Sequence, residues 1–183
     1  MEHDQNHDRK ATPLSGARAR LKPSRAHAIL SAVDHGALVG LWESTPYDHG
    51  SLETCWLGFL QDDRGWSAWA SMAGGIDVDR FRWHCPAADV LELRYEWHAS
   101  GDWQRTGNAL TVATITEQES GDEVVQTGFT IGPDETAMTR SPFTALHLEL
   151  ALQFCKDYAF RQRGISTRDD PAHDVSPWSS PAP

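Results

Sequence analysis

Glu43 is the side chain in this sequence whose surroundings best suit acid–base chemistry. It lies in LVGLWES (38–44), and the two-residue period of a strand would place it on the same side as Val39 and Leu41. If that side faces an apolar interior, burial would raise the pKa of the carboxyl, which could then donate or accept a proton. A position at a solvated rim is the alternative. We therefore expect Glu43 to be the catalytic residue if the protein is an enzyme.

A few other polar residues could orient a small molecule. Tyr47, Asp48 and His49 follow the first strand in a loop that could cover an opening. Gln126 and Thr130 share a strand face, from which they could form hydrogen bonds to a ligand carbonyl. Nucleophilic catalysis has no comparable support, because the chain lacks G-x-S-x-G and none of its cysteines has an activating neighbour.

The histidines do not show the pattern of a metal site. His84 is next to Cys85, but adjacent residues of a strand point to opposite faces. His98 and His147 occupy the polar positions of their strands, and no cysteine pair has the C-x-x-C spacing of a structural zinc site. We expect no metal, no haem and no other cofactor.

Eight segments have the composition and the two-residue period of strands. In 89–98 the residues Leu91, Leu93, Tyr95 and Trp97 alternate with polar ones, so one face should be dry and the other wet. The last segment, 144–154, carries leucines at alternate positions, although its residues would also suit a helix that begins at Ser141. The other six predicted strands are 38–44, 55–61, 65–72, 76–85, 108–118 and 124–131.

Short links between these strands, with no crossover helices, indicate an antiparallel meander. Such a sheet leaves two exposed edges unless it closes, and closure at eight strands gives a barrel that holds side chains or one small ligand. A two-sheet sandwich is the structural alternative. We expect an all-β fold, an eight-stranded antiparallel up-and-down β-barrel over 23–163, with a short N-terminal helix at 24–35. Polar sequence predicts disordered tails at 1–22 and 164–183.

Gly40-Leu41-Trp42 matches the G-x-W signature of the lipocalin-like, or calycin, barrels. Over residues 36–162 the chain resembles them in the helix before the first strand and in its strand plan. The T-D-Y signature of the secreted members is absent from the sequence, and we expect neither their disulfide nor their export signal. The chain therefore looks most like the intracellular bacterial members. The G-x-W-x-G-x-G run of the haem-binding nitrobindins is also missing.

This resemblance implies a role for Trp42 as the plug of the narrow end of the barrel. The plug would pack against an arginine from the end of the last strand, for which Arg161 is the matching position and Arg163 the second choice. A guanidinium on an indole contributes roughly 0.5–2 kcal/mol. Otherwise Trp42 is a core aromatic residue.

The predicted interior of the barrel is largely aromatic and apolar. Such an interior suits a hydrophobic or conjugated small molecule, with a few polar groups to orient it. The alternative is that the rings fill the barrel completely. The residues predicted to bind the ligand are Leu57, Phe59, Phe81, Trp83, Leu93, Tyr95, Trp97 and Gln126.

Composition excludes some classes of partner. A formal net charge of -10 disfavours nucleic acid, since the protein would repel phosphate backbones. No segment has the pattern of a signal peptide or the roughly 20 apolar residues of a spanning helix. Three widely separated cysteines are expected to be reduced and buried. We therefore expect a cytoplasmic protein with no membrane partner.

Three functions fit these features. The first is a carrier or sensor that binds an apolar metabolite in the barrel. The second is a cofactor-independent cyclase or isomerase that folds a polyketide-like or polyene substrate, with orientation and exclusion of water supplying much of the rate. The third is a filled barrel that acts as an interaction module.

Overall fold

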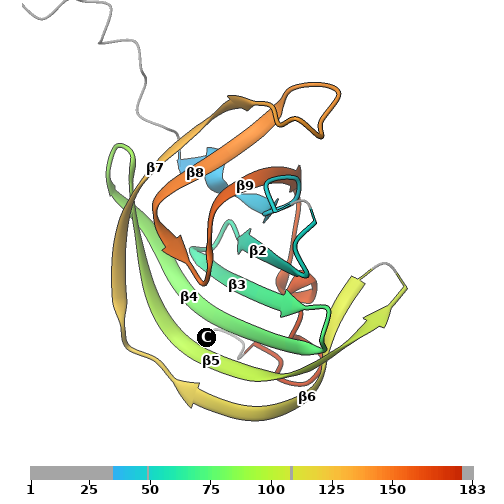
Figure 1. Cartoon of the computed structure of the whole chain (residues 1–183). Helices are drawn as coiled ribbons and strands as arrows, with labels where there is room; N and C mark the ends of the chain where they lie inside the picture. The colour runs from blue at the N-terminus through green and yellow to red at the C-terminus, as the bar shows by residue number, and fades with distance from the viewer. Residues whose placement is uncertain (1–34, 49, 108, 179–183) are drawn as a thin grey trace, which may run out of the picture. The chain divides into compact units, whose positions relative to one another are not determined.

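The computed structural model describes residues 35–48, 50–107 and 109–178, and they form an almost entirely β structure (Figure 1). The predicted N-terminal helix at 24–35 lies outside this part of the chain except for His35, and the predicted tail at 1–22 lies wholly outside it. The elements are α1 (His35–Leu38), β1 (Gly40–Glu43), β2 (Glu53–Phe59), β3 (Arg64–Ser71), β4 (Gly75–Ala87), β5 (Val90–Thr106), β6 (Ala109–Ser120), β7 (Val124–Asp134), β8 (Phe143–Leu152), β9 (Cys155–Gln162) and the 3-10 helix η2 (Thr167–Asp169).

Eight of the strands close into an antiparallel barrel. The sheet runs β4-β3-β2-β1-β9-β8-β7-β5, and the β4–β5 hairpin joins its two ends. This confirms the predicted eight-stranded barrel and excludes the two-sheet sandwich. The membership differs from the prediction: β6 lies outside the barrel, and β9, whose sequence CKDYAFRQ has a weak two-residue period, is the missing eighth strand.

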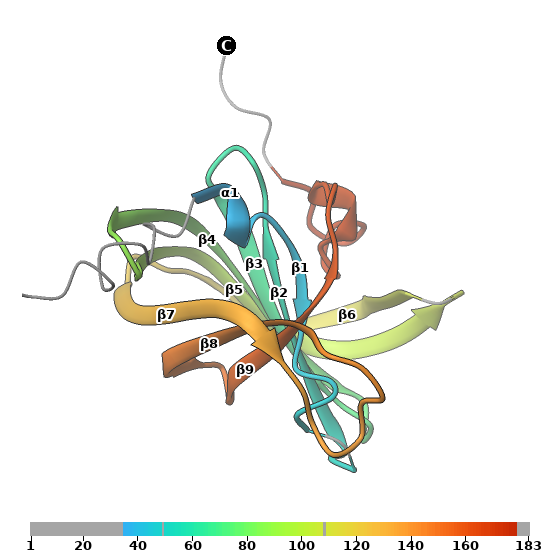
Figure 2. The same cartoon turned by 90° about the horizontal axis from the view of Figure 1, so that it is seen from above.

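The long strand β5 has two different partners along one edge. Its first residues, Val90–Arg94, pair with β7, whereas Trp97–Thr106 pair with β6. Figure 2 shows β6 and the distal end of β5 extending away from β7 and β8. The β5–β6 hairpin is therefore a ribbon attached to the barrel wall.

Side chains fill the barrel interior. Alternate residues of each strand point inward, as the pleat of a strand requires. The central side chains of this interior cluster are 3 % exposed or less, so the interior is packed in the way of an ordinary protein core. The cluster includes Trp42, Leu57, Phe59, Phe81, Trp83, Leu91, Leu93, Phe129, Leu146 and Tyr158.

A second apolar cluster lies on the outer side of the sheet. It contains Trp66 and Ile76 from β3 and β4, and Ala172 from the C-terminal segment. Residues 164–178, predicted as part of a disordered tail, instead pack against the barrel up to Trp178. The reason is a contact that no local pattern reveals: the Arg80 guanidinium lies 2.6 Å from the buried carboxylate of Asp170.

Stacking completes this attachment. The Arg80 guanidinium lies 4.4 Å from the ring centre of Trp97 and 4.7 Å from that of Trp178. Burial raises the pKa of Asp170, while the charge of Arg80 acts in the opposite direction. A polar segment is thus fixed by one buried ion pair and two indoles.

Trp42 lies at the α1 end of the barrel core, and its implied role as a plug stays a prediction. It is fully buried, its Nε1 donates to the Leu38 carbonyl at 2.7 Å, and its ring meets Phe160 edge-on. Gly40 is required beside it, because a Cβ there would lie 2.6 Å from the Gln162 carbonyl oxygen, and its φ of 139° is strained for other residues.

The arginine at this end is Arg163 rather than Arg161. Arg163 donates to the carbonyls of Gly36 and Val39 and stacks at 5.2 Å on Phe160, which in turn contacts Trp42. Arg161 has the opposite strand parity and pairs with Glu43 on the outside. Among the described residues no arginine stacks on Trp42 as expected, and Arg163 stacks on Phe160 instead.

The cysteines differ from the prediction of three reduced thiols. Cys55 of β2 and Cys155 of β9 form a disulfide, and Cys85 is the free thiol. Burial raises the pKa of Cys85. Spacing along the chain did not indicate the pair, because 100 residues separate its members. None of the helices in the described part of the chain is long and apolar enough to cross a membrane.

Candidate functional site

Five residues predicted to bind a ligand do face the barrel interior. Leu57, Phe59, Phe81, Trp83 and Leu93 belong to the interior cluster, and none is more than 1 % exposed. They pack on one another, with Phe59 and Trp83 in an edge-on contact at 5.1 Å. Their role in ligand binding remains a prediction. Other side chains already cover their surfaces, so a ligand would have to displace part of the core to reach them.

Two predicted polar residues face the other way. Glu43 shares its parity with Leu41, as expected, but Leu41 packs in the outer cluster, and the Glu43 carboxylate lies 2.7 Å from Arg161. The expectation that Glu43 points into the barrel was therefore wrong. Gln126 is exposed and donates to Glu92 at 2.5 Å on the outside of β5 and β7.

A β-bulge in β5 decides which residues reach the mouth of the barrel. Phe81 of β4 pairs with Tyr95, and Arg80 pairs with Trp97, so Glu96 is an extra residue. The alternation inverts at this point. Tyr95 points inward as predicted, but Trp97 turns outward onto Arg80, and His98, which the pattern placed on the polar face, turns inward.

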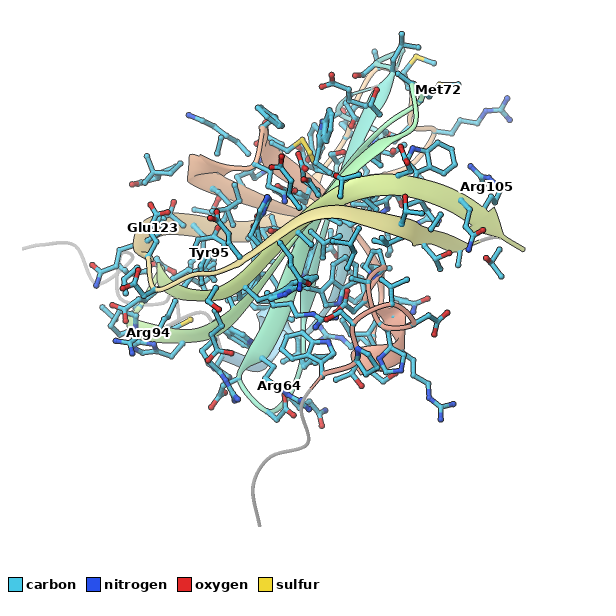
Figure 3. All side chains as sticks on the ribbon, turned by 90° about the horizontal axis from the view of Figure 1, so that it is seen from below. Arg64, Met72, Arg94, Tyr95, Arg105 and Glu123 are labelled. Atoms are coloured by element: carbon cyan, nitrogen blue, oxygen red, sulfur yellow. A yellow bond between two sulfur atoms is a disulfide. The ribbon has the colours of Figure 1, made fainter. Side chains whose placement is uncertain are left out.

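The cavity at this mouth has a volume of about 410 Å³. It opens where β7 changes partner, because Val124–Gly128 pair with β5 and only Phe129–Asp134 pair with β8. Figure 3 labels Tyr95 and Glu123, two of its wall residues. The lining comprises Asp79, Tyr95, Trp97, His98, Glu119, Gly121, Glu123, Val125, Ala151, Leu152 and Gln153.

Asp79 is the centre of the hydrogen bonds in this cavity. Its Oδ1 lies 2.7 Å from Nδ1 of His98, and its Oδ2 accepts from the Gln153 amide at 2.8 Å and from the Ser67 hydroxyl at 3.3 Å. These partners come from β3, β5 and the β8–β9 turn. The carboxylate is thus fixed at the point where three parts of the wall meet.

Gln153 is unusual in two ways. Its side-chain oxygen is buried and has no hydrogen-bond partner among the described residues, although its NH₂ is bound to Asp79. Its φ of 45° is in the left-handed region, which costs a residue with a Cβ about 1–2 kcal/mol. Strained residues with unsatisfied polar groups are concentrated at functional sites.

The cavity has a negative potential. Asp79, Glu119 and Glu123 line it, and none of the described residues in its lining is a lysine or an arginine. The pKa of Tyr95 is raised by burial and then by the charges of Asp79 and Glu123. Asp77, on the same face of β4 as Asp79, also has a raised pKa, mainly because of burial. A group that donates hydrogen bonds or carries positive charge is therefore favoured here.

The site can support two kinds of chemistry. Asp79 can orient the His98 imidazole, which is the arrangement of a general base. The unpaired oxygen of Gln153 can accept a hydrogen bond from a ligand. No group of three or more potential metal ligands occurs within the described ranges.

The sequence contains one signal for this site that the predictions above do not use. Asp77 and Asp79 share strand parity with Phe81 and Trp83, so acids were already indicated on the inner face of β4. His98 had no such signal, because its direction depends on the bulge.

Comparison with protein-family models, with curated proteins and with solved structures finds no match for this chain. Of the resemblance to lipocalin-like proteins, the structure supports the closed eight-stranded antiparallel barrel.

Proposed function

We propose that the protein binds a small amphipathic molecule at the mouth of the barrel, with a cationic or hydrogen-bond-donating group at Asp79 and Gln153. The observation that carries this proposal is the buried side-chain oxygen of Gln153 beside the Asp79 carboxylate, for which no described residue supplies a hydrogen bond. Leaving a buried acceptor without a partner costs about 1–3 kcal/mol, which a bound donor would recover.

The size and the remaining walls of the cavity fit the same ligand. A volume of about 410 Å³ lies in the range of small-molecule sites, roughly 300–1,000 Å³. Tyr95, Val125 and Leu152 supply an apolar side for a ring or a short chain. A molecule deep in the barrel would have to displace fully buried side chains, so the mouth is the better position.

A second candidate function is acid–base catalysis on such a molecule. The 2.7 Å contact between Asp79 and His98 favours it, since a carboxylate fixes the imidazole orientation that proton transfer requires. An isomerase or cyclase activity would then use His98 rather than Glu43. Replacement His98→Gln would abolish turnover and leave binding within about threefold if this candidate is correct.

Binding is tested by calorimetric titration with 2-naphthylmethylamine and its neutral analogue 2-naphthylmethanol. We expect the cationic amine to bind at least about fivefold more tightly than the alcohol. Asp79→Asn should weaken amine binding about tenfold or more, because a hydrogen bond to a charged group is worth about 1.5–3 kcal/mol.

The matched control is Asp102→Asn, which changes an exposed aspartate of β5 outside the cavity. This variant should bind the amine like the wild type. Equal affinities for amine and alcohol in both the wild type and Asp79→Asn would contradict the proposed site.

A further inference from the structure

A larger groove, with a volume of about 670 Å³, lies outside the barrel. Its walls come from β1, β2, β3 and the end of β9, from the loop before β2, from the β5–β6 hairpin, and from residues 168–171 of the C-terminal segment. Tryptophans from three strands, with aliphatic residues between them, make an apolar floor. These residues are Leu41, Trp56, Trp66, Ala70, Trp103 and Leu110.

The floor is held in place by the fold. The Trp103 indole donates to the Ser71 carbonyl at 2.7 Å, which fixes its ring against the end of β3. Trp66 lies against Gly58, where a Cβ would be 2.4 Å from the indole. The Trp66 Nε1 is buried and has no hydrogen-bond partner among the described residues. The groove is therefore preformed, and its lining includes an unused donor.

The arginines around the groove distinguish it from the rest of the protein. Arg105, Arg161 and Arg168 all line it, in a chain of formal net charge -10. Of these three arginines, only Arg161 has an ion-pair partner in the described part of the chain, namely Glu43 at 2.7 Å. Arg105 and Arg168 form no ion pair with a described residue.

The acids nearby are already engaged elsewhere. Asp169 accepts from the backbone N and the hydroxyl of Ser166, closing the capping box that fixes the turn before Arg168. Asp170 is buried on Arg80. Two guanidiniums without an ion-pair partner among the described residues thus flank an aromatic surface, and guanidinium groups bind carboxylates through two parallel hydrogen bonds.

We infer that this groove is a second ligand site, which binds a planar aromatic carboxylate. The ring lies on the indole floor, and Arg105 and Arg168 recognise the carboxylate. The charge preference is opposite to that of the barrel mouth, so the inference stands independently of the function proposed there.

The test is a titration with 2-naphthoate and its neutral analogue 2-naphthamide, followed by calorimetry and tryptophan fluorescence. We expect naphthoate to bind at least about fivefold more tightly than the amide. Arg105→Gln and Arg168→Gln should each weaken naphthoate binding at least about fivefold and leave amide binding unchanged. Both side chains are exposed, so thermal unfolding should remain as in the wild type.

The matched control is Arg94→Gln, which removes an exposed arginine from the same strand as Arg105. Figure 3 shows Arg94 and Arg105 at opposite ends of β5. Arg94→Gln and Asp79→Asn should both bind naphthoate with wild-type affinity. Equal binding of naphthoate and amide, an equal loss in Arg94→Gln, or a loss in Asp79→Asn would overturn the inference.

Discussion

At the scale of single residues, Gln153 has a backbone conformation that its side chain does not favour. Its left-handed φ is one that glycine adopts without strain, yet the position carries a long amide bound to Asp79. The fold therefore accepts a local cost to place an amide in the cavity. A residue selected only for the β8–β9 turn would be glycine or asparagine.

Replacing Gln153 separates strain from binding. Gln153→Gly and Gln153→Ala both remove the amide, so both should weaken 2-naphthylmethylamine binding at the mouth by the same factor, about fivefold or more. The glycine variant should have a free energy of unfolding about 1 kcal/mol higher than the alanine variant, because only alanine retains the Cβ that the left-handed backbone disfavours. Urea unfolding measures the difference.

Each variant serves as the control for the other. Equal stabilities would show that the backbone at Gln153 is not strained. Undiminished amine binding in both variants would remove the amide from the site.

Individual partners were the part of the structure least accessible from sequence. The signature and the strand period both point to Trp42 as an interior residue, and the structure buries it completely, while its role as a plug stays a prediction. The choice between Arg161 and Arg163 could not be predicted, because it depends on the parity with which β9 meets β1. The ion pair of Arg80 with Asp170 joins residues 90 positions apart, and no local pattern contains it.

At the scale of the elements, the two-residue period identified most strands and failed where a strand is irregular. It placed Tyr95 and Trp97 on one face, and the bulge at Glu96 separated them. The period also missed β9, whose apolar positions are few. Bulges arise from how neighbouring strands twist and pair, so a single sequence does not reveal them.

Deletion of Glu96 tests this account of β5. Loss of one residue within a strand normally turns every later side chain to the other face. Here the extra residue is removed, so Trp97 should stay on Arg80 and His98 on Asp79. We expect the free energy of unfolding to decrease by only about 1–2 kcal/mol. The deletion removes the hydrogen bond that the Gly121 N–H donates to the Glu96 carbonyl and the exposed ion pair of Glu96 with Arg82.

Deletion of Arg94 is the matched control two residues earlier. It would turn the partly buried Tyr95 outward and place the Glu96 carboxylate inside the barrel, which together should cost about 3 kcal/mol or more. Urea unfolding of both variants gives the comparison. Similar losses in the two variants would contradict the assignment of Glu96 as the extra residue.

At the scale of the whole barrel, the hydrogen-bond ladder of the closed wall stops short next to its shortest strand. β1 ends at Glu43, whose partners are Trp56 of β2 and Ala159 of β9. Beyond it, β2 and β9 continue without a strand between them. The Cys55–Cys155 disulfide joins them there, and Ser44 holds Cys55 through its backbone N and its hydroxyl. A covalent bond thus continues the wall where the hydrogen-bond ladder stops.

The position of this bond predicts a large effect of reduction on stability. It closes a loop of sequence separation 100, and cross-links of that length lower the entropy of the unfolded chain by an amount worth up to about 4.7 kcal/mol. We expect dithiothreitol to lower the free energy of unfolding by about 3–4 kcal/mol in urea titrations. Thiol titration under denaturing conditions should find one free cysteine before reduction and three after it.

The double variant Cys55→Ala/Cys155→Ala separates the disulfide from other actions of the reductant. It should have about the stability of the reduced protein and should not respond to dithiothreitol, whereas Cys85→Ala should respond as the wild type does. The main-chain bonds of β1 to β2 and β9 do not depend on sulfur, so the reduced barrel should still fold and bind 2-naphthoate in the outer groove. An unchanged urea midpoint on reduction would mean that the hydrogen bonds of Ser44 and β1 suffice to hold this part of the wall.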